Sequence, residues 1–578
     1  PAPDAAHRLQ GYEPPADAVE QTLAEIWQAV LGVERVGRHD NFFQLGGHSL
    51  LAVTLVERMR QHGLSADVRV LFGQPTLAAL AAAIGTAGDV EVPPNLIPPD
   101  CRRITPELLT LVDVSQEAID RIVATVPGGA ANVQDIYPLA PLQEGVLYHH
   151  LAARQGDPYL QSVQLSFDSR DRMDRFVHAL QQVIDHHDVF RTSVIWEGLE
   201  TPVQVVWRKA TLVLSQLVPE PVHGDALERL HATFNPARYR LDLSTAPLLQ
   251  FHYAYDLANA RWVAMLLIHH LVDDAATMHV LQAELHAYMS GDSAQLGAST
   301  PYRNYVAQAR RDGRQAEREA FFRSEFADFE SPTLPYGLHD IRGNGYAAEH
   351  SADLLEAGLH GRICAWAARL GVTPSSVYHL AWAHVVGQVA ASDDVVFGTV
   401  LLGRMQAGTG ADRAMGMFIN TLPLRVRLTK QSAREAIHAV HAQLSALLLH
   451  EHAALSEVQR CSGVAPPLPL FSALLNYRSY QRAPLSSERS TPWQGIDILQ
   501  SQRGSHYPVA LDVEELEDSV RLTMHMPAGH GAQRMCTYMQ SALAHLVEAL
   551  EQAPELPLSQ LRVMPEAERR QLLGFNIA

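Results

Sequence analysis

Two short segments contain residues whose types and spacing are suited to chemistry. In the first, Gly46-Gly47-His48-Ser49 leads directly into an apolar-periodic helix. A glycine turn that brings a serine to the start of a helix leaves the hydroxyl approachable at the positive end of the helix dipole, which favours an attached phosphate. The same serine could instead be a helix N-cap, which contributes about 1 kcal/mol. It does not match a hydrolase nucleophile, because GxSxG requires a glycine where Leu51 stands.

The second segment is a pair of histidines followed by two acids. Of three His-His pairs in the chain, only His269-His270 follows a continuously apolar run and precedes Asp273 and Asp274. Strand ends that run into loops often carry functional side chains, and a nearby carboxylate can orient an imidazole or fix the turn. Hydrogen-bonded core histidines remain an alternative. No metal site is predicted, because the sequence has no HExxH segment and no third ligand at a useful spacing.

Length and composition narrow the class of protein. The 578 residues exceed one compact core and indicate three to four domain-sized units. The formal charge of −18 disfavours nucleic acid and anionic membranes as partners. No stretch of about 20 apolar residues and no leading signal segment is present. Four scattered cysteines without CxxC spacing indicate reduced thiols, so we expect a cytoplasmic protein, excised from a longer chain.

The first 85 residues have the pattern of a small helical bundle. Apolar residues at helical spacing predict helices over residues 19–30, from Leu51 to Met59, and from Pro75 to about Ile84. The Ser49 loop would then join the first two helices. Residues 85–106 break the pattern, and Pro93, Pro94, Pro98 and Pro99 among polar residues predict a semi-rigid linker. About 20 extended residues span at most about 70 Å, which is ample for the bundle to dock on the next domain of the chain.

Two mixed α/β units of roughly 200 residues each are expected after the linker. Alternating residues predict half-buried strands over 163–167 and 249–255, and the apolar run 262–268 predicts a central strand. Residues 176–184 form a helical pattern between them. In the second unit, the pattern predicts helices over 359–370 and from Thr373-Pro374 onward, and a strand over 395–402.

His269-His270-x-x-x-Asp274 resembles the HHxxxDG motif of nonribosomal peptide synthetase condensation domains, which have the chloramphenicol acetyltransferase-like fold. Gly46 to Leu51 likewise resembles the GGHSL motif of peptidyl carrier proteins, and the tail 565–576 resembles the entry to an adenylation domain. Asn304 replaces the aspartate of the family's YxDY element. Further segments that resemble condensation-domain motifs, in order, are 138–145 (PLAPLQEG), 187–192 (HDVFRT), 302–305 (YRNY), 398–404 (GTVLLGR) and 417–425 (MFINTLPLR).

The resemblance implies a carrier–condensation didomain with two pseudo-symmetric lobes. Its expected parts are a carrier domain (1–85), a linker (86–106), an N-terminal lobe (107–285), and a C-terminal lobe with the lead-in to an adenylation domain (286–578). Ser49 would carry 4′-phosphopantetheine, attached by a separate phosphopantetheinyl transferase. The implied reaction transfers an acyl or peptidyl thioester on Ser49 to the amine of a downstream carrier-bound aminoacyl thioester. Expected partners are that downstream carrier and adjacent adenylation domains. The protein itself is expected to be a monomer.

The resemblance also implies roles for single residues. His270 would act on the acceptor amine, mainly by orienting it, while His269 would be structural. Asp274 would pair with Arg404 in a buried contact that holds the loop. Asp273 has no assigned counterpart and is interpreted as a solvated loop acid. Asn420 is either near the tunnel or a turn residue.

One residue departs from the motif, since Ala275 stands where the family has glycine. If a positive φ were required, alanine would cost about 1 kcal/mol. If the glycine only leaves room, one methyl group could be tolerated.

Three other functions remain as alternatives. An epimerization domain shares the fold and the histidine pair, but no EGHGR-like element is found. A heterocyclization domain would carry DxxxxD where His269-His270 stands. A catalytically silent, partner-recruiting domain is disfavoured by intact His269, His270 and Asp274.

Overall fold

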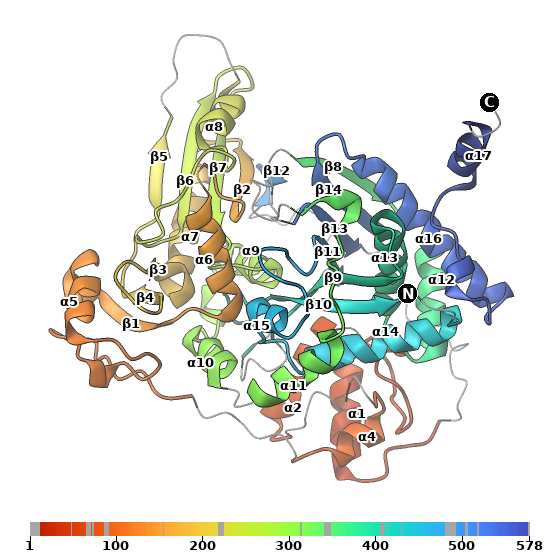
Figure 1. Ribbon diagram of the computed structural model, residues 1–578. Coiled ribbons are helices and arrows are strands. Elements are labelled where there is room, and N and C mark those ends of the chain that lie inside the picture. The colour runs from red at the N-terminus through yellow and green to blue at the C-terminus, as the bar shows by residue number, and fades with distance from the viewer. Residues whose placement is uncertain are drawn as a thin grey trace.

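The computed structural model describes residues 12–47, 49–64, 71, 74–85, 92–153, 155–217, 225–311, 315–339, 348–404, 410–411, 413–428, 431–479, 493–502, 507–516 and 519–575. Along this part of the chain, a small helical bundle precedes two α/β lobes (Figure 1). The bundle is drawn in red to red-orange, the first lobe from orange to yellow-green, and the second from green to blue. This arrangement confirms the predicted fold class.

The bundle forms where the apolar periodicity predicts it. Its helices are α1 (Ala18–Leu31), α2 (Ser49–Gln61) and α4 (Leu77–Ala82). α1 begins at Asp17, whose side chain accepts a hydrogen bond from the Glu20 amide at 2.8 Å. The apolar faces meet around Trp27, Phe42 and Leu55, which are fully buried. All three predicted helices are therefore confirmed.

The proline-containing segment after the bundle is attached to the first lobe along its described length. Ile97, Cys101 and Ile104 are buried in a cluster with side chains of that lobe. Arg303 donates a hydrogen bond to the Pro93 carbonyl at 3.0 Å. Residues 92–106 are thus not a free linker, because three of their apolar side chains are buried against the first lobe.

The first lobe is built on a five-stranded sheet. Its strands and helices are β1 (Val133–Pro138), β2 (Leu160–Phe167), β3 (Thr192–Ile195), β4 (Val203–Trp207), β5 (Val213–Gln216), β6 (Leu249–Asp256), β7 (Arg261–His269), α7 (Arg170–His186), α8 (Ala226–Phe234) and α9 (Ala275–Ser290). The sheet has the order β12-β2-β7-β6-β5, where β12 is Ile496–Gln502, and β1-β4-β3 form a smaller sheet. β7 is central, as its apolar run predicts. α8 packs on β6 and β7, whereas α7 packs on β2 and α9.

β2 differs from the half-buried strand that its alternation predicts. Its polar side chains Gln161, Ser162, Gln164 and Ser166 are buried, whereas the apolar Val163 is only partly buried. The reason is tertiary, since β7 pairs along one edge of β2 and β12 along the other. Alternating polar and apolar residues show that one face of a strand is polar, but they do not show whether that face contacts solvent or a polar interior.

The second lobe has a six-stranded sheet, ordered β10-β9-β11-β13-β14-β8. Its elements are β8 (Ala348–Leu354), β9 (Asp394–Leu401), β10 (Asn420–Arg427), β11 (Ala473–Ser479), β13 (Val509–Glu515), β14 (Val520–Pro527), α12 (Leu359–Leu370), α13 (Pro374–Ala390), α14 (Ala433–Leu448) and α16 (Ala532–Gln552). α13 is buried almost all round, from Ser376 to Gly387, and packs against α12, α14 and α16. The predicted helices and strand of this unit are confirmed.

One strand of the first sheet comes from the second half of the chain. β12 pairs antiparallel with β2, with Ile496 opposite Phe167 and Gln502 opposite Ser162. The range 286–578 therefore does not fold only into the second lobe. Periodicity identifies strands but not the sheet that a strand joins, so the sequence could not indicate this exchange.

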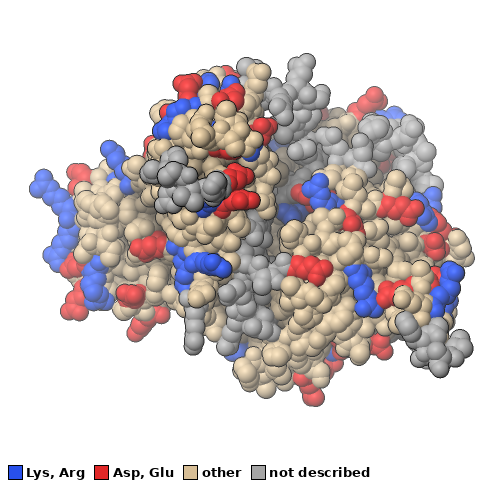
Figure 2. Space-filling view, turned by 90° about the horizontal axis from the view of Figure 1, so that it is seen from above, with Lys and Arg blue, Asp and Glu red and all other residues tan. Residues whose placement is uncertain are grey.

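The remaining helices surround the two lobes. They are α5 (Gln116–Thr125), α6 (Pro141–Ala152), α10 (Arg303–Arg311), α11 (Gln315–Phe326), α15 (Leu455–Arg460) and α17 (Glu566–Phe575). Within the described part of the chain, no helix is long and apolar enough to cross a membrane. Acidic and basic side chains are interspersed on the face shown in Figure 2 rather than gathered by sign.

Candidate active site

A cavity of about 610 Å³ is lined by all three units of the molecule. His270 and Asp273 face it from the first lobe, His379 and Thr399 from the second. The bundle contributes the loop that leads to Ser49. Its lining residues from that loop are Phe43, Gln44, Gly46 and Gly47. The structure thus brings the Gly46-Gly47 loop and the His270 segment to one cavity, although more than 200 residues separate them in the sequence.

His270 lies just beyond β7 with a defined ring orientation. Its amide donates to the Tyr159 carbonyl at 2.8 Å. Its Nδ1 lies 2.8 Å from the Asp273 carbonyl oxygen and 3.0 Å from Asp273 Oδ1. Because both neighbours are acceptors, Nδ1 carries the proton and Nε2 is the basic nitrogen. The side chain is 22% exposed, so the ring is reachable from the cavity.

Asp273 is not the solvated loop acid that we expected. It is fully buried, and Oδ1 also accepts a hydrogen bond from Gln161 Nε2 at 3.3 Å. The turn between β7 and α9 brings the carboxylate to the His270 ring, three residues back along the chain. A charged residue in a loop is usually exposed, and only the turn geometry shows the exception.

His269 points away into the lobe and is held by a second carboxylate. Its Nδ1 accepts from the Leu271 amide at 3.2 Å, so Nε2 donates to Asp157 Oδ2 at 3.0 Å. His150 Nδ1 contacts the same oxygen. Burial opposes ionisation of Asp157, but the neighbouring His269 ring and hydrogen bonds from both His269 and His150 hold its pKa below the ordinary value. The sequence did not indicate Asp157 or His150 as part of the site.

Asp274 and Arg404 form the predicted buried pair between the lobes. Arg404 Nη2 lies 2.9 and 3.1 Å from the two Asp274 oxygens, and each side chain is 1% exposed. Asp274 also caps α9 by accepting from the Thr277 amide at 2.7 Å. Arg404 donates to the carbonyls of Ala411 and Ala414. These contacts connect the start of α9 to the 410–414 segment and are architectural.

Ala275 is the first residue of α9 and has no positive φ. The alternative in which this position requires a left-handed backbone is therefore wrong. Ala275 lines the cavity, so its methyl group affects only the available room.

Asn420 opens β10 and is buried. Its side-chain nitrogen donates to the carbonyls of Glu451 and Ala453, both at 2.7 Å. Its neighbours Ile419 and Thr421 line the cavity, whereas Asn420 is absent from the described lining. These contacts favour the turn-fixing interpretation.

Two clusters have enough potential ligands close together for a metal ion. Within the described residues they are His150, Asp157 and His269, and His186, His187 and Glu284, each with ligand atoms within 4.8 Å of one another. Hydrogen bonds account for the contacts of Asp157 in the first cluster and for the His187–Glu284 contact in the second. In each cluster one residue, His269 or Glu284, is distant in the sequence from the other two, so a search for metal-ligand spacing could not find the cluster.

The loop before Ser49 fits close approach of a tethered group. Gly46 has φ +97°, and a Cβ at Gly47 would collide with Phe42. α2 begins at Ser49, so the loop ends at a helix N-terminus. The bundle is seated on the second lobe, because Glu57 Oε2 accepts from the Gly410 amide at 2.9 Å and Phe43 contacts His441 edge-on. The loop before Ser49 is therefore held against the second lobe at the wall of the cavity.

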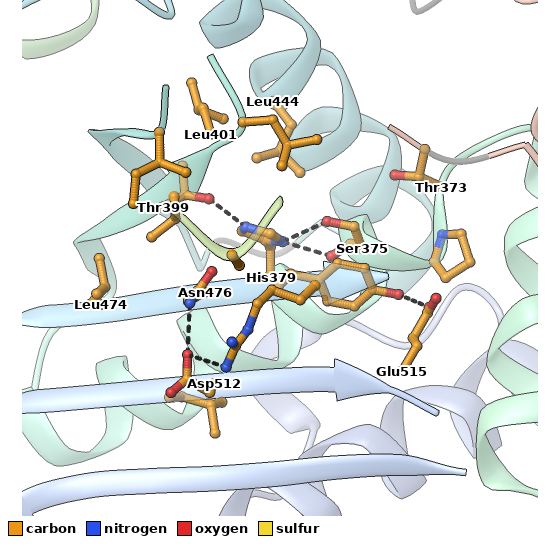
Figure 3. A pocket seen from close by; sticks show the side chains of 18 of the residues that line it. Thr373, Ser375, His379, Thr399, Leu401, Leu444, Leu474, Asn476, Asp512 and Glu515 are labelled. Carbon is orange, nitrogen blue, oxygen red and sulfur yellow. Dashed lines mark hydrogen bonds and ion pairs between the residues drawn. The ribbon is translucent and has the colours of Figure 1, made fainter. Parts of the chain in front are cut away.

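The second-lobe wall of the cavity mixes apolar side chains with polar ones that hydrogen-bond to one another (Figure 3). His379 Nδ1 donates to the Ser375 carbonyl at 2.7 Å, and its Nε2 accepts from Thr399 Oγ1 at 2.8 Å. Asp512 lies between Asn476, Arg478 and His525. Burial opposes ionisation of Asp512, but Arg478 and hydrogen bonds from His525 and Asn476 hold its pKa below the ordinary value.

Comparisons with known proteins agree with this site. Residues 133–573 match the condensation domain family, and residues 21–84 match the phosphopantetheine attachment site. The chain therefore belongs to the condensation domain family and carries a carrier domain, with covalent 4′-phosphopantetheine as its cofactor. The order of the two domains is that of a carrier–condensation fragment of a nonribosomal peptide synthetase, and it supports nonribosomal peptide-bond formation in general.

Particular relatives are large synthetases. The chain is 46% identical over its whole length to malpinin synthetase and 44% identical over 99% to malpibaldin synthetase, both from Mortierella alpina. It spans only 7% and 10% of these proteins. The fold resembles that of the condensation domain from monacolin K polyketide synthase, with 18% identity, a TM-score of 0.58, and coverage of 74% of this chain and 100% of that one. It also resembles a structure described as holo T3CT, with 18% identity, a TM-score of 0.57, and coverage of 78% and 100%.

Proposed function

We propose that this chain transfers an acyl or peptidyl group from a thioester carried on Ser49 to the amine of an aminoacyl thioester on a downstream carrier. The observation that carries the proposal is the orientation of His270, with Nδ1 held by Asp273 and Nε2 basic, in a cavity whose wall includes the Gly46-Gly47 loop before Ser49. The arm attached to Ser49 would supply the thioester and the reach to present it. Gly46 and Gly47 would let that arm approach the backbone closely.

His270 orients the acceptor amine by accepting its hydrogen bond at Nε2. An α-amine has a pKa near about 8, so roughly a tenth is already neutral at pH 7, and deprotonation accounts for only about 1.4 kcal/mol. Holding two substrates in reactive geometry contributes about 7–11 kcal/mol. The amine nitrogen then bonds to the thioester carbonyl carbon, the C–S bond breaks, and the amine proton passes through Nε2 to the departing sulfur.

The other site residues support this geometry without touching substrate. Asp157 fixes the ring of His269 through a hydrogen bond, and the Asp274–Arg404 pair fixes the start of α9. We propose a monomer in the cytoplasm, loaded by a phosphopantetheinyl transferase and working between adenylation domains.

A single loaded-carrier assay tests the proposal. Ser49 is charged with an α-deuterated aminoacyl-pantetheine, and a downstream aminoacylated carrier or a soluble amine mimic is supplied. His270→Ala should lower amide formation by about 10²–10⁴-fold, as expected for loss of a general base. His178→Ala removes an exposed histidine of α7 and serves as the matched control.

Three outcomes contradict the proposal. Amide formation by His270→Ala at the parental rate removes the role of His270. Loss of deuterium without transfer indicates epimerization. Neither transfer nor exchange, with the arm loaded, indicates a partner-recruiting domain.

A further inference from the structure

We propose that the carboxylate of Asp273 is a positioning residue that acts through His270, forming an Asp–His pair that stabilises the protonated imidazole during transfer. This inference rests on the proposed function and deepens it. It starts from a residue that the sequence pattern left without a role and that the structure places under the ring of His270.

The two acceptors at His270 Nδ1 have separable roles. The Asp273 carbonyl oxygen, at 2.8 Å, is sufficient to fix the tautomer with the proton on Nδ1. The carboxylate, at 3.0 Å, adds a negative charge to the same nitrogen. A carboxylate so close favours the charged form of an imidazole, so it should raise the proton affinity of Nε2.

The carboxylate has no comparable structural duty. Oδ1 faces His270 and Gln161, and Oδ2 is buried without a hydrogen-bond partner among the residues that the structure describes. Leaving a carboxylate oxygen buried and unbonded is unfavourable. The neighbouring acid, Asp274, already caps α9 and pairs with Arg404. The turn is therefore held by Asp274, and the incompletely satisfied charge of Asp273 is directed at the imidazole.

Other titratable groups around His270 do not replace this charge. From the first lobe, Tyr159 packs near the ring at 6.4 Å between centroids, and His149 packs on Tyr159. The charge of Asp274 is paired with Arg404, and Asp157 with His150 and His269. From the second lobe and the opposite wall, the titratable side chains lining the cavity are His360, Cys364, His379, His441, Tyr477, Arg478, Tyr507, Asp512, Glu515 and His525.

The pair has a defined place in the reaction. When the amine attacks, its proton moves to His270 Nε2 and the ring becomes an imidazolium next to the Asp273 carboxylate. The same proton then leaves Nε2 for the departing sulfur as the C–S bond breaks. No proton moves to Asp273, which contributes only its charge.

Asp273→Asn is the direct test, because it keeps the size and the backbone carbonyl but removes the charge. We expect amide formation at pH 7 to fall about 10- to 100-fold and the acidic limb of the pH–rate profile to move to lower pH by about one pH unit. The ring nitrogen NMR signals of His270 should keep the Nδ1–H tautomer. His270→Ala/Asp273→Asn should be no slower than His270→Ala alone.

Controls separate this effect from loss of structure. Asp274→Asn should lower thermal stability without moving the pH limb. Asp273→Ser provides a second uncharged variant if Asp273→Asn does not fold. In the unsubstituted protein, His270 should titrate at a higher pH than a histidine in a short unstructured peptide, whose pKa is about 6.5.

Two results would overturn the inference. One is an unchanged rate and pH profile in the folded uncharged variant. The other is a His270 titration midpoint at or below that of a histidine in a short unstructured peptide, which requires no variant. If His270→Ala itself retains the parental rate, the proposed function fails instead, so the two failures are distinguishable.

Discussion

The two walls of the cavity place histidines in opposite electrostatic settings. On the first-lobe wall, His270 and the adjoining His269 each contact a buried carboxylate, Asp273 and Asp157 respectively. On the second-lobe wall, His379 contacts a carbonyl and a hydroxyl group, and burial lowers its pKa to about 4 (Figure 3). The first-lobe wall therefore sets a negative charge beside the ring of His270, whereas the second-lobe wall sets no charge beside His379 and keeps that ring neutral by burial.

This difference shows that residue type alone does not assign a function. Burial disfavours the imidazolium, whereas a neighbouring carboxylate favours it, and the balance decides whether a ring can exchange protons near neutral pH. Burial lowers the pKa of His379, and its carbonyl and hydroxyl partners supply no negative charge that would offset this effect. It is a polar part of the core, although it lines the same cavity as His270.

The largest expected effect comes from removing the carboxylate shared by two histidines. Asp157→Ala leaves the rings of His150 and His269 buried without their acceptor, so the free energy of unfolding should fall by about 3–5 kcal/mol. Urea denaturation checks this result. Asp168→Ala, an exposed acid of the same lobe, is the control. A loss below about 1 kcal/mol would mean that the three side chains are not coupled.

The second effect is a loss of stability in acid that originates at His379. Its pKa is lowered from about 6.5 to about 4, so the unfolded chain binds a proton first as the pH falls. The stabilisation is complete above pH 6.5 and is lost between pH 6.5 and 4, up to about 3 kcal/mol. Burial likewise lowers the pKa of His252, in the first lobe, to about 4.

His379→Gln should remove about one proton from this dependence in a series of urea denaturations from pH 7 to 4.5. A slope that is equal in the parent and His379→Gln contradicts the neutral assignment of His379. By contrast, Asp157 has a lowered pKa, so its contribution persists above the ordinary aspartate range and is lost only at lower pH.

Local features of this fold could be predicted from the sequence, whereas long-range pairings could not. Apolar periodicity located α1, α2, α12 and β7, because each depends on residues within a few turns or one strand. It also placed His269 and His270 at a strand end. The partners of His269 could not be found, since Asp157 and His150 lie more than 100 residues away in the sequence. The transfer of β12 to the first sheet was missed for the same reason.

The prediction that Asp273 is solvated was wrong even though its partner, His270, lies only three residues away in the sequence. The signal was present as an acid three residues after a histidine. Deciding whether that acid is solvated or buried requires the course of the turn, which depends on Gln161 of β2 and on the cap of α9. Motif resemblance also misdirected the interpretation, since it assigned roles to Asp274 and none to its neighbour.

A third prediction tests the neutral wall directly. Thr399→Val removes the hydroxyl that faces His379 Nε2 and preserves the shape of the side chain. The free energy of unfolding should fall by about 1–3 kcal/mol, because a buried ring nitrogen loses its partner. This loss is smaller than that expected for Asp157→Ala, since no buried charge is left uncompensated. Urea denaturation at pH 7 checks the ranking, and the reverse order would contradict the comparison of the two walls.

The smallest expected effect concerns the contact that seats the bundle on the second lobe. Glu57 is 4% exposed, and its Oε2 accepts the Gly410 amide at 2.9 Å. Glu57→Ala should expose that amide, so its hydrogen exchange in the intact chain should accelerate by about tenfold, as expected for loss of one hydrogen bond to a charged group. Glu25→Ala, on the exposed side of α1, is the matched control. Because the contact lies outside both walls, the pH–rate profile should keep its shape while the amide becomes accessible. An altered profile would mean that bundle docking, and not only Asp273, sets the proton affinity of His270.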